Sequence, residues 1–376
     1  MPTISNPAVP ARRGYLADIY TFDWKQLSFR IPLIGVIAVG LCLFAGVLLG
    51  HPSAGLIAGG GAFTIGFGIN QRIADSRLRP MIGATCAMAV STLIGMLAGH
   101  RSITLVLAAA VWGFAYGLLT AGAAGISWVG QQAAITLFVA SAFPADLHAA
   151  LLRTLLIFSG GALQILITSL SLCLLPELAA SLRTGTEELS ALLIHNPARH
   201  LQQLRAIPET LTHIPSFPYA IRLSLTIAIA AEAYRQLGIQ SGYWIPMTAL
   251  LVQKPAFSET VSRAFLRVGG TLAGAVISTV FLVHIHPNPF YLAALATFFA
   301  LWSYATNTVN YGLYTLFLTS YIVFLLSLNA LPGPVIAHRR ALCTVAGGAI
   351  AILIHVDAIR RLRKRTLSAP TPALPQ

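Results

Sequence analysis

The chain has 376 residues, of which 56% are hydrophobic and only 9% charged, and its mean hydropathy is +0.75. A soluble domain carries roughly 25% charged residues, so this composition argues against a water-soluble enzyme, a disordered protein and a secreted disulfide scaffold. The net charge of +13 comes from basic residues in the gaps between apolar runs, which predicts a protein embedded in a lipid bilayer and no nucleic-acid binding.

The first 28 residues are predicted to form a cytoplasmic or interfacial segment. Leu16, Tyr20, Trp24 and Leu27 recur at helical spacing. This pattern predicts a helix over residues 14–28 that lies along the membrane surface.

Twelve apolar runs follow this segment, and a bilayer core of about 30 Å needs about 20 apolar residues per helix. The runs lie at 31–50, 54–69, 81–99, 103–122, 126–143, 149–175, 219–239, 243–254, 268–286, 290–307, 309–328 and 335–356. They predict an all-α polytopic membrane protein with about twelve transmembrane helices. A six-helix membrane unit at 29–175, a cytoplasmic connector at 176–218 and a second unit at 219–356 precede a basic, partly disordered cytoplasmic tail at 357–376.

The distribution of positive charge predicts the orientation of the chain. If the N-terminus is cytoplasmic, 19 of the 24 Lys and Arg residues fall on the cytoplasmic side and 5 on the outer side. Cytoplasmic loops carry an excess of basic residues, so both termini are predicted to lie in the cytoplasm. The basic run at 360–365 is then expected to bind anionic lipid.

The two membrane units share residues at a nearly constant offset, between 179 and 192 positions over the whole length. Matching positions at offsets of 187 and 188 include Arg153 with Arg340, Gly160 with Gly347, and Arg79 with Arg267. The offset predicts two homologous six-helix repeats. Because six is even, the repeats are parallel, related by an axis along the membrane normal. Chance similarity of Gly/Ala/Leu-rich helices is the alternative.

The strongest local motif opens the second unit. Residues 242–255 read Gly-Tyr-Trp-Ile-Pro-Met-Thr-Ala-Leu-Leu-Val-Gln-Lys-Pro, and Arg267 is followed by Gly-Gly-Thr at 269–271. This combination resembles the fusaric acid resistance protein-like family of bacterial inner-membrane transporters, which includes the aromatic acid exporters. The resemblance implies efflux of small organic acids, aromatic carboxylates foremost, across the bacterial inner membrane. It also implies a periplasmic adaptor protein as a partner.

A substrate path is predicted between the two halves. The short segments at 54–69 and 243–254 are interrupted by Gly or Pro at repeat-related positions, a pattern that points to the substrate site in repeat-built transporters. Amides and aromatic rings near the starts of the fifth and eleventh helices would be penalised by lipid. The predicted substrate-binding residues are Trp128, Gln131, Tyr243, Trp244, Asn307 and Asn310. Close helix packing and interhelical hydrogen bonds without a ligand are the alternatives.

Charged residues near the membrane segments supply two further hypotheses. Glu232 lies inside a predicted helix and is the candidate for proton coupling, although an ion pair with Arg235, three residues on, is an equal alternative. Four arginines are predicted at membrane entrances. Anchoring to phospholipid headgroups is their favoured role, and capture of anions is the alternative. They are Arg79, Arg153, Arg267 and Arg340.

The sequence contains no nucleotide-binding, metal-binding or hydrolase motif. We therefore expect no enzyme activity, no metal and no cofactor, and the proton gradient as the energy source. A passive organic-anion channel or uniporter is one alternative function, and a non-transporting membrane assembly subunit is another. A homo-oligomer is left open.

Overall fold

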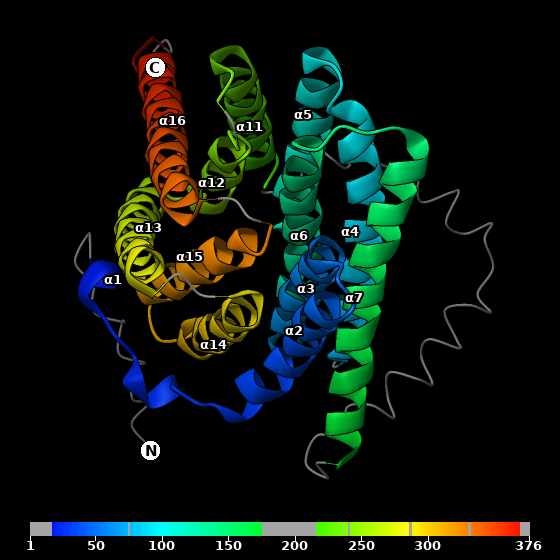
Figure 1. Cartoon of the computed structure of the whole chain (residues 1–376). Helices are drawn as coiled ribbons and strands as arrows, with labels where there is room; N and C mark the ends of the chain where they lie inside the picture. The colour runs from blue at the N-terminus through cyan, green and yellow to red at the C-terminus, as the bar shows by residue number, and fades with distance from the viewer. Residues whose placement is uncertain are drawn as a thin grey trace, which may run out of the picture.

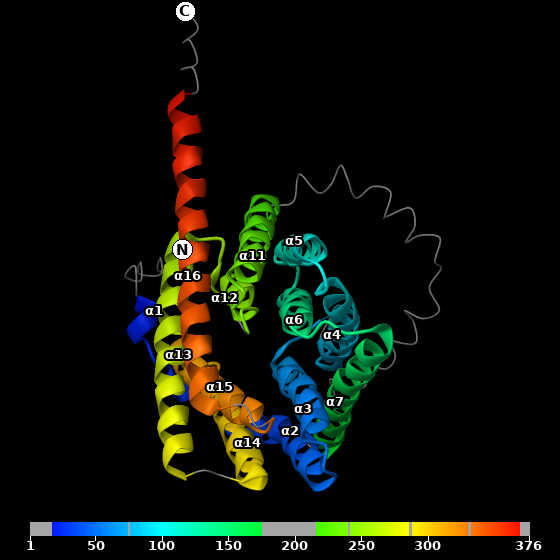
Figure 2. The same ribbon diagram turned by 45° about the horizontal axis from the view of Figure 1, so that its top comes forward.

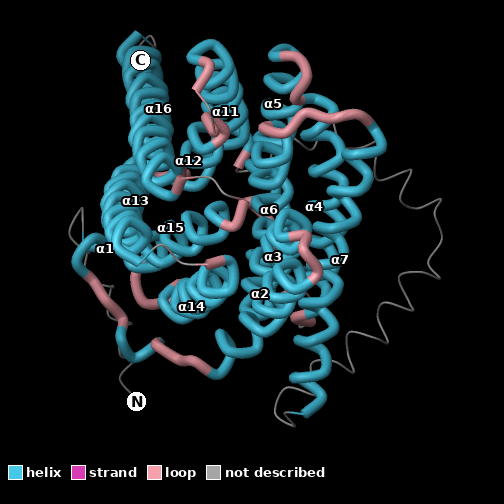
Figure 3. The backbone as a smooth tube through the Cα atoms, in the orientation of Figure 1, coloured by secondary structure: helices cyan, strands magenta, loops and turns pink. Residues whose placement is uncertain are grey.

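The computed structural model describes residues 17–73, 76–174, 216–239, 241–285, 288–329 and 332–368. Over these ranges the chain is helical, with turns and one isolated bridge between Ile73 and Ser76 as the other elements (Figure 3). Most of the predicted connector at 176–218, the first 16 residues and the last eight lie outside the described residues.

The helices agree with the predicted apolar runs. The first unit contains α2 (Arg30–Leu48), α3 (Pro52–Gly66), α4 (Leu78–Ala98), α5 (Ser102–Leu119), α6 (Ala124–Ser141) and α7 (Leu147–Leu174). The second contains α11 (Phe217–Leu237), α12 (Trp244–Val252), α13 (Phe257–Ile285), α14 (Pro289–Thr306), α15 (Tyr311–Ser327) and α16 (Gly333–Ser368). The prediction of an all-α chain with twelve such helices is confirmed. Seven helices in the described ranges are long and apolar enough to cross a bilayer, and the protein is a multi-pass membrane protein.

Two boundaries in the second half of the chain correct the predictions. α13 begins at Phe257, well before the predicted start at 268, so Arg267 lies inside the helix. α16 continues to Ser368, well past the predicted end at 356, and extends beyond the other helices (Figure 2).

The N-terminal segment is not the single interfacial helix predicted over 14–28. It forms α1 (Ala17–Tyr20) and a 3₁₀ turn, η1 (Trp24–Gln26), and then leads into α2. The Asp23 N–H donates to the Val309 carbonyl at 3.1 Å, and the Asn310 side chain donates to the Thr21 carbonyl at 2.9 Å. The segment therefore ties the start of the first unit to the loop between α14 and α15 in the second (Figure 1).

The helices of the two units pack in corresponding pairs. α3 and α4 pack on α7, and α4 on α6; α12 and α13 pack on α16, and α13 on α15. The units meet where α5 packs on α11 and where α14 packs on α2 (Figure 1). Each unit thus contacts the other through the first and the fourth of its six helices.

Glycines allow the closest helix crossings. A Cβ at Gly160 of α7 would collide with the Ala58 carbonyl of α3, and a Cβ at Gly347 of α16 with the Ile245 carbonyl of α12. Gly347 comes 187 positions after Gly160, and Ile245 comes 187 positions after Ala58. In the same way Gly95 approaches the Leu137 carbonyl and Gly274 the Leu316 carbonyl, with an offset of 179.

The second pair of crossings sets the register between α4 and α13. In this register Arg267 corresponds to Met88, because these residues are also 179 positions apart. This register differs from the predicted correspondence of Arg79 with Arg267, and the relation of the two units as repeats stays a prediction.

Contacts between loops define two ends of the bundle. At one end Ser53 bonds Asn329, Arg235 bonds Ser102 and His100 contacts the Ala145 carbonyl. At the other end Asp23 bonds Val309, Ser216 bonds Leu118 and Arg222 bonds Lys254. Each of these contacts joins loops or helix ends that are predicted to lie on the same side of the membrane, and the topology itself stays a prediction.

Candidate anion-binding site

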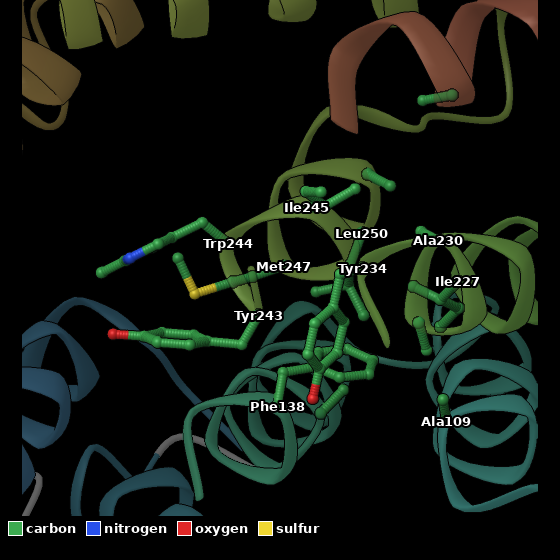
Figure 4. Packing of buried hydrophobic residues seen from close by; sticks show 14 of the residues in the cluster. Ala109, Phe138, Ile227, Ala230, Tyr234, Tyr243, Trp244, Ile245, Met247 and Leu250 are labelled. Atoms are coloured by element: carbon green, nitrogen blue, oxygen red, sulfur yellow. The ribbon is translucent and has the colours of Figure 1, made fainter. Parts of the chain in front are cut away.

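The short helix α12 carries two aromatic side chains at its start. Tyr243 and Trp244 are only 4% and 5% exposed, and their ring centroids lie 4.7 Å apart. Figure 4 shows Tyr243, Trp244 and Met247 projecting to one side of α12, away from Ile227 of α11. The chain enters α12 through a tight turn in which Ser241 has a φ of 64°. This turn presents the two rings to α16.

Arg340 of α16 lies against these rings. Its guanidinium carbon is 4.1 Å from the centroid of Trp244, a cation–π distance, and its Nε donates to Thr319 Oγ1 at 3.2 Å. The side chain is 1% exposed. Its two Nη atoms are buried, and neither has a hydrogen-bond partner among the described residues. Two charged donors therefore remain open.

Arg267 of α13 is the second buried guanidinium. It is also 1% exposed, and all three of its side-chain nitrogens lack a hydrogen-bond partner in the described part of the chain. Its charge acts on Arg340, and the charges of both act on Tyr314 of α15. The four-residue spacing places Thr271, whose buried hydroxyl also lacks a partner, on the same helix face as Arg267.

Two like charges without counter-charge form an unstable arrangement in a protein interior. Removing one partner of a buried ion pair costs about 3–5 kcal/mol because a buried charge is left uncompensated. Arg267 and Arg340 together present five guanidinium nitrogens in this condition. An anion with several acceptor oxygens would satisfy these donors, so the two arginines form a candidate anion-binding site.

Further cations and rings extend from this site in two directions. On one side, Arg263, one turn before Arg267, lies 4.5 Å from the centroid of Tyr311. On the other side, the ring of Tyr243 lies 6.5 Å from that of Phe143, which Arg153 covers at 4.1 Å. The result is a file of cations and aromatic rings from α13 to α7, with three rings in succession between Arg340 and Arg153.

The structure brings together five of the predicted site residues: Tyr243, Trp244, Arg153, Arg267 and Arg340. The predicted location of Arg267 and Arg340 at membrane entrances is wrong, because both are fully buried. Arg79 lies apart, half-buried at the start of α4, where its backbone N–H donates to Ser76 Oγ.

The other predicted contacts have different surroundings. Trp128 packs in a separate cluster with Ile65 and Met81, and Gln131 is half-buried on the same helix. Asn307 is exposed at the end of α14. Asn310 caps α15, because its Oδ1 accepts hydrogen bonds from the Gly312 and Leu313 N–H groups. Its side-chain amide therefore bonds mainly to the backbone.

The predicted ion pair between Glu232 and Arg235 does not form. Glu232 is half-buried near the end of α11 and accepts a hydrogen bond from Gln236. Arg235 donates to Ser102 of α5 at 3.3 Å. Both groups stay near the end of the bundle, away from Arg267 and Arg340.

Several residues of this region were missed in the sequence. Tyr314 and Thr319 looked like ordinary core positions of an apolar helix, and Gln253 was noted only as part of a motif. Gln253 is fully buried, and neither atom of its side-chain amide has a partner among the described residues. The four-residue spacing of Arg263, Arg267 and Thr271 was the signal available, because it marks one polar face on a helix.

A family model and several known proteins match parts of this chain. Residues 226–354 match the family model described as fusaric acid resistance protein-like. An uncharacterized protein, ORF2, of Neisseria gonorrhoeae is 30% identical over 138 residues, which cover 36% of this chain and 32% of that protein. The uncharacterized protein YhfK of Escherichia coli K12 is 31% identical over 176 residues, 46% of this chain and 25% of YhfK.

A third relative carries a functional name. The uncharacterized transporter YdhK of Escherichia coli K12 is 26% identical over 114 residues, 29% of this chain and 17% of YdhK. The matches thus span about a third or less of the length of these relatives. No solved structure shows a significant match. Trp244, Arg267 and Arg340 all lie within the 226–354 region of this multi-pass membrane protein that is similar to the fusaric acid resistance protein-like family.

Proposed function

We propose that this protein transports small organic anions, with aromatic carboxylates as the foremost class. Arg267 and Arg340 bind the carboxylate, while Trp244 and Tyr314 contact the ring. The observation that carries the proposal is the pair of fully buried guanidinium groups, with five nitrogens that have no partner in the described residues.

The chemistry of the site favours a flat organic acid over a small inorganic ion. Guanidinium groups bind carboxylates through two parallel hydrogen bonds, and the open nitrogens supply such pairs. Trp244 and Tyr314 lie beside these charges, and aromatic rings pair favourably with other rings at centroid distances of about 4.5–7 Å. A ligand with an anionic head and a ring would use both features.

The domain match supports transport as the activity, and a relative is named a transporter. We propose export across a bacterial inner membrane, driven by the proton gradient and without enzymatic chemistry. A periplasmic adaptor would carry the anion onward. The corresponding glycine crossings in α7 and α16 support two parallel six-helix repeats. The anion site lies within the second unit, and the proposed substrate path leads from it to the first unit at Phe143 and Arg153.

A passive channel is the second candidate function. The file of cations and rings from Arg263 to Arg153 favours it, because an anion could pass from one charge to the next without a large conformational change. Accumulation of the anion against its own gradient would identify a transporter, and current that follows the electrochemical gradient without saturation would identify a channel.

Uptake into liposomes tests the proposal directly. Benzoate crosses bilayers as the neutral acid, so the probe is radiolabelled benzenesulfonate, which stays ionised. We expect saturable uptake that benzoate inhibits, that cyclohexanecarboxylate inhibits several-fold more weakly, and that benzylamine leaves unchanged. Equal inhibition by the aromatic and the saturated acid would refute the role of the rings, and absence of uptake would refute transport of organic anions.

The orientation predicts a labelling pattern. In a Cys-free background, cysteine at His51 is expected to react with an impermeant maleimide in cells with a permeabilised outer membrane, because this exposed turn is placed outside. Cysteine at Gly122, equally exposed, is expected to react only after the inner membrane is disrupted. The opposite pattern would invert the topology.

A further inference from the structure

A buried histidine lies at the other end of the domain from Arg340. His355 of α16 is 2% exposed, and its ring packs edge-on against Phe257 of α13 at 5.2 Å. Its Nδ1 lies 3.2 Å from the Oγ1 atom of Thr260, also on α13. The ring is therefore held between two helices by one polar contact and one apolar contact.

Thr260 connects this histidine to the end of α12. Its Oγ1 accepts the Lys254 N–H at 3.0 Å, and it lies 3.1 Å from the Ala256 carbonyl and 3.3 Å from that of Lys254. A hydroxyl has one proton to donate, so it can satisfy only one of Nδ1 and the two carbonyls at a time. The hydrogen-bond direction at Thr260 thus depends on the protonation of His355.

Protonation would reverse this hydrogen bond. In the neutral tautomer with its proton on Nε2, Nδ1 accepts a hydrogen bond from the Thr260 hydroxyl, and when His355 is protonated Nδ1–H donates to Oγ1 instead. The hydroxyl must then donate to the Lys254 or Ala256 carbonyl. The segment that follows α12 would thereby gain a hydrogen bond on protonation and lose it on deprotonation.

α12 lies along α16 between this histidine and the anion site. Trp244 at its start contacts Arg340, Gly347 faces the Ile245 carbonyl and Thr248, and Lys254 just after its end reaches His355 through Thr260. Arg340 and His355 are about 22 Å apart along the helix, at 1.5 Å per residue. A shift of α12 would therefore change both the Trp244 contact with Arg340 and the link from Lys254 through Thr260 to His355.

We propose that His355 binds the proton that drives transport, and that α12 couples this proton to the anion held by Arg340 and Arg267. This inference rests on the proposed function. The imidazole takes up one proton, and the Thr260 hydrogen bond changes direction. α12 is then displaced, and with it Trp244 beside the anion. Glu232, which lies half-buried at the end of α11, is not needed for this role.

Other charged groups surround His355 without replacing it. Arg222 of α11 acts on it electrostatically, and Asp357 lies two residues further along α16. Glu259 of α13 is exposed. Lys254 lies outside the candidate spans, and burial, with the charge of Arg263, lowers its pKa to about 8. A pKa of about 8 leaves most of its ammonium groups protonated at pH 7 and below.

The experiment compares exchange with proton-driven accumulation of benzenesulfonate in liposomes. We expect His355→Gln to keep exchange at equal pH within about twofold and to lose accumulation driven by a pH difference. A trapped pH-sensitive dye should report no proton movement with the anion. Thr260→Val, which removes the hydroxyl and keeps the shape, should give the same result. His338→Gln, an exposed histidine of the same helix, is the matched control and should accumulate normally.

The outcomes separate this inference from the proposed function. If the wild-type protein exchanges no benzenesulfonate, the proposed function fails. If the wild type accumulates the anion and His355→Gln does so equally well, the proton site lies elsewhere. Exchange by the wild type with no response to a pH difference would also overturn the coupling. If His355→Gln does not fold, Thr260→Val decides by the same two assays.

Discussion

Replacing Arg267 by methionine is expected to abolish anion transport and to raise the thermal stability of the ligand-free protein. Both effects have one cause, which is that the three guanidinium nitrogens are buried without partners in the described structure. An apolar side chain of similar volume removes an uncompensated charge, and replacing buried charges in this way is often neutral or stabilising by about 1–4 kcal/mol. Loss of a buried charge contact to the ligand costs about 3 kcal/mol, or roughly 100-fold in affinity.

The measurements are benzenesulfonate uptake and the apparent melting temperature in detergent. Arg340→Met should lose transport similarly and gain less stability, because Arg340 also contacts Thr319 and Trp244. Arg339→Met, which changes the adjacent and half-buried arginine, is the matched control and should retain uptake. A clear fall in melting temperature for Arg267→Met would mean that this guanidinium is structurally paired, contrary to the site described here.

The second large effect is expected at the helix crossings. Gly160→Ala should lower stability by about 1–3 kcal/mol, because the new methyl group would overlap the Ala58 carbonyl and force the helices apart. Gly347→Ala should do the same at the Ile245 carbonyl. If the two halves are repeats, the two losses should be similar in size.

Two other glycines of the same helix system serve as controls. A Cβ at Gly60 of α3 or at Gly269 of α13 meets no atom within 4 Å. Alanine is the better helix former by about 1 kcal/mol, so these variants should be as stable as the wild type or slightly more so. Equal falls in melting temperature for Gly60→Ala and Gly160→Ala would show that close helix approach is not the reason for glycine at these positions.

The positions of the helices could be predicted closely because lipid imposes one rule on the backbone. A chain that crosses a bilayer must satisfy its N–H and C=O groups within helices or closed barrels, and apolar runs separated by basic loops reveal where helices form. The short run at 243–254 illustrates this, since α12 occupies Trp244–Val252. The same rule failed at α13, where Glu259, Arg263 and Arg267 were taken to mark the region before the helix rather than its first turns.

The candidate site could be predicted only in part. Tyr243 and Trp244 stood out because aromatic rings followed by proline open a helix too short to cross the membrane. The wrong environment was assigned to Arg267 and Arg340, because an arginine near a helix end normally extends to the interface. Nothing in the local sequence distinguished His355 from the other histidines, since its burial depends on Phe257 and Thr260 of α13.

By itself the sequence determined the all-helical class, the number of helices and the motif shared with a known domain, because composition, periodicity and local motifs do not depend on distant contacts. Only the tertiary structure decided that Arg267 and Arg340, far apart in the chain, are both buried and act on one another, with Arg340 against Trp244. The physical reason is that the state of a charge depends on what surrounds it in space. In the described structure, helix packing removes water and counter-charges from both guanidinium groups. The spacing of residue types along the chain does not indicate which helices will pack there.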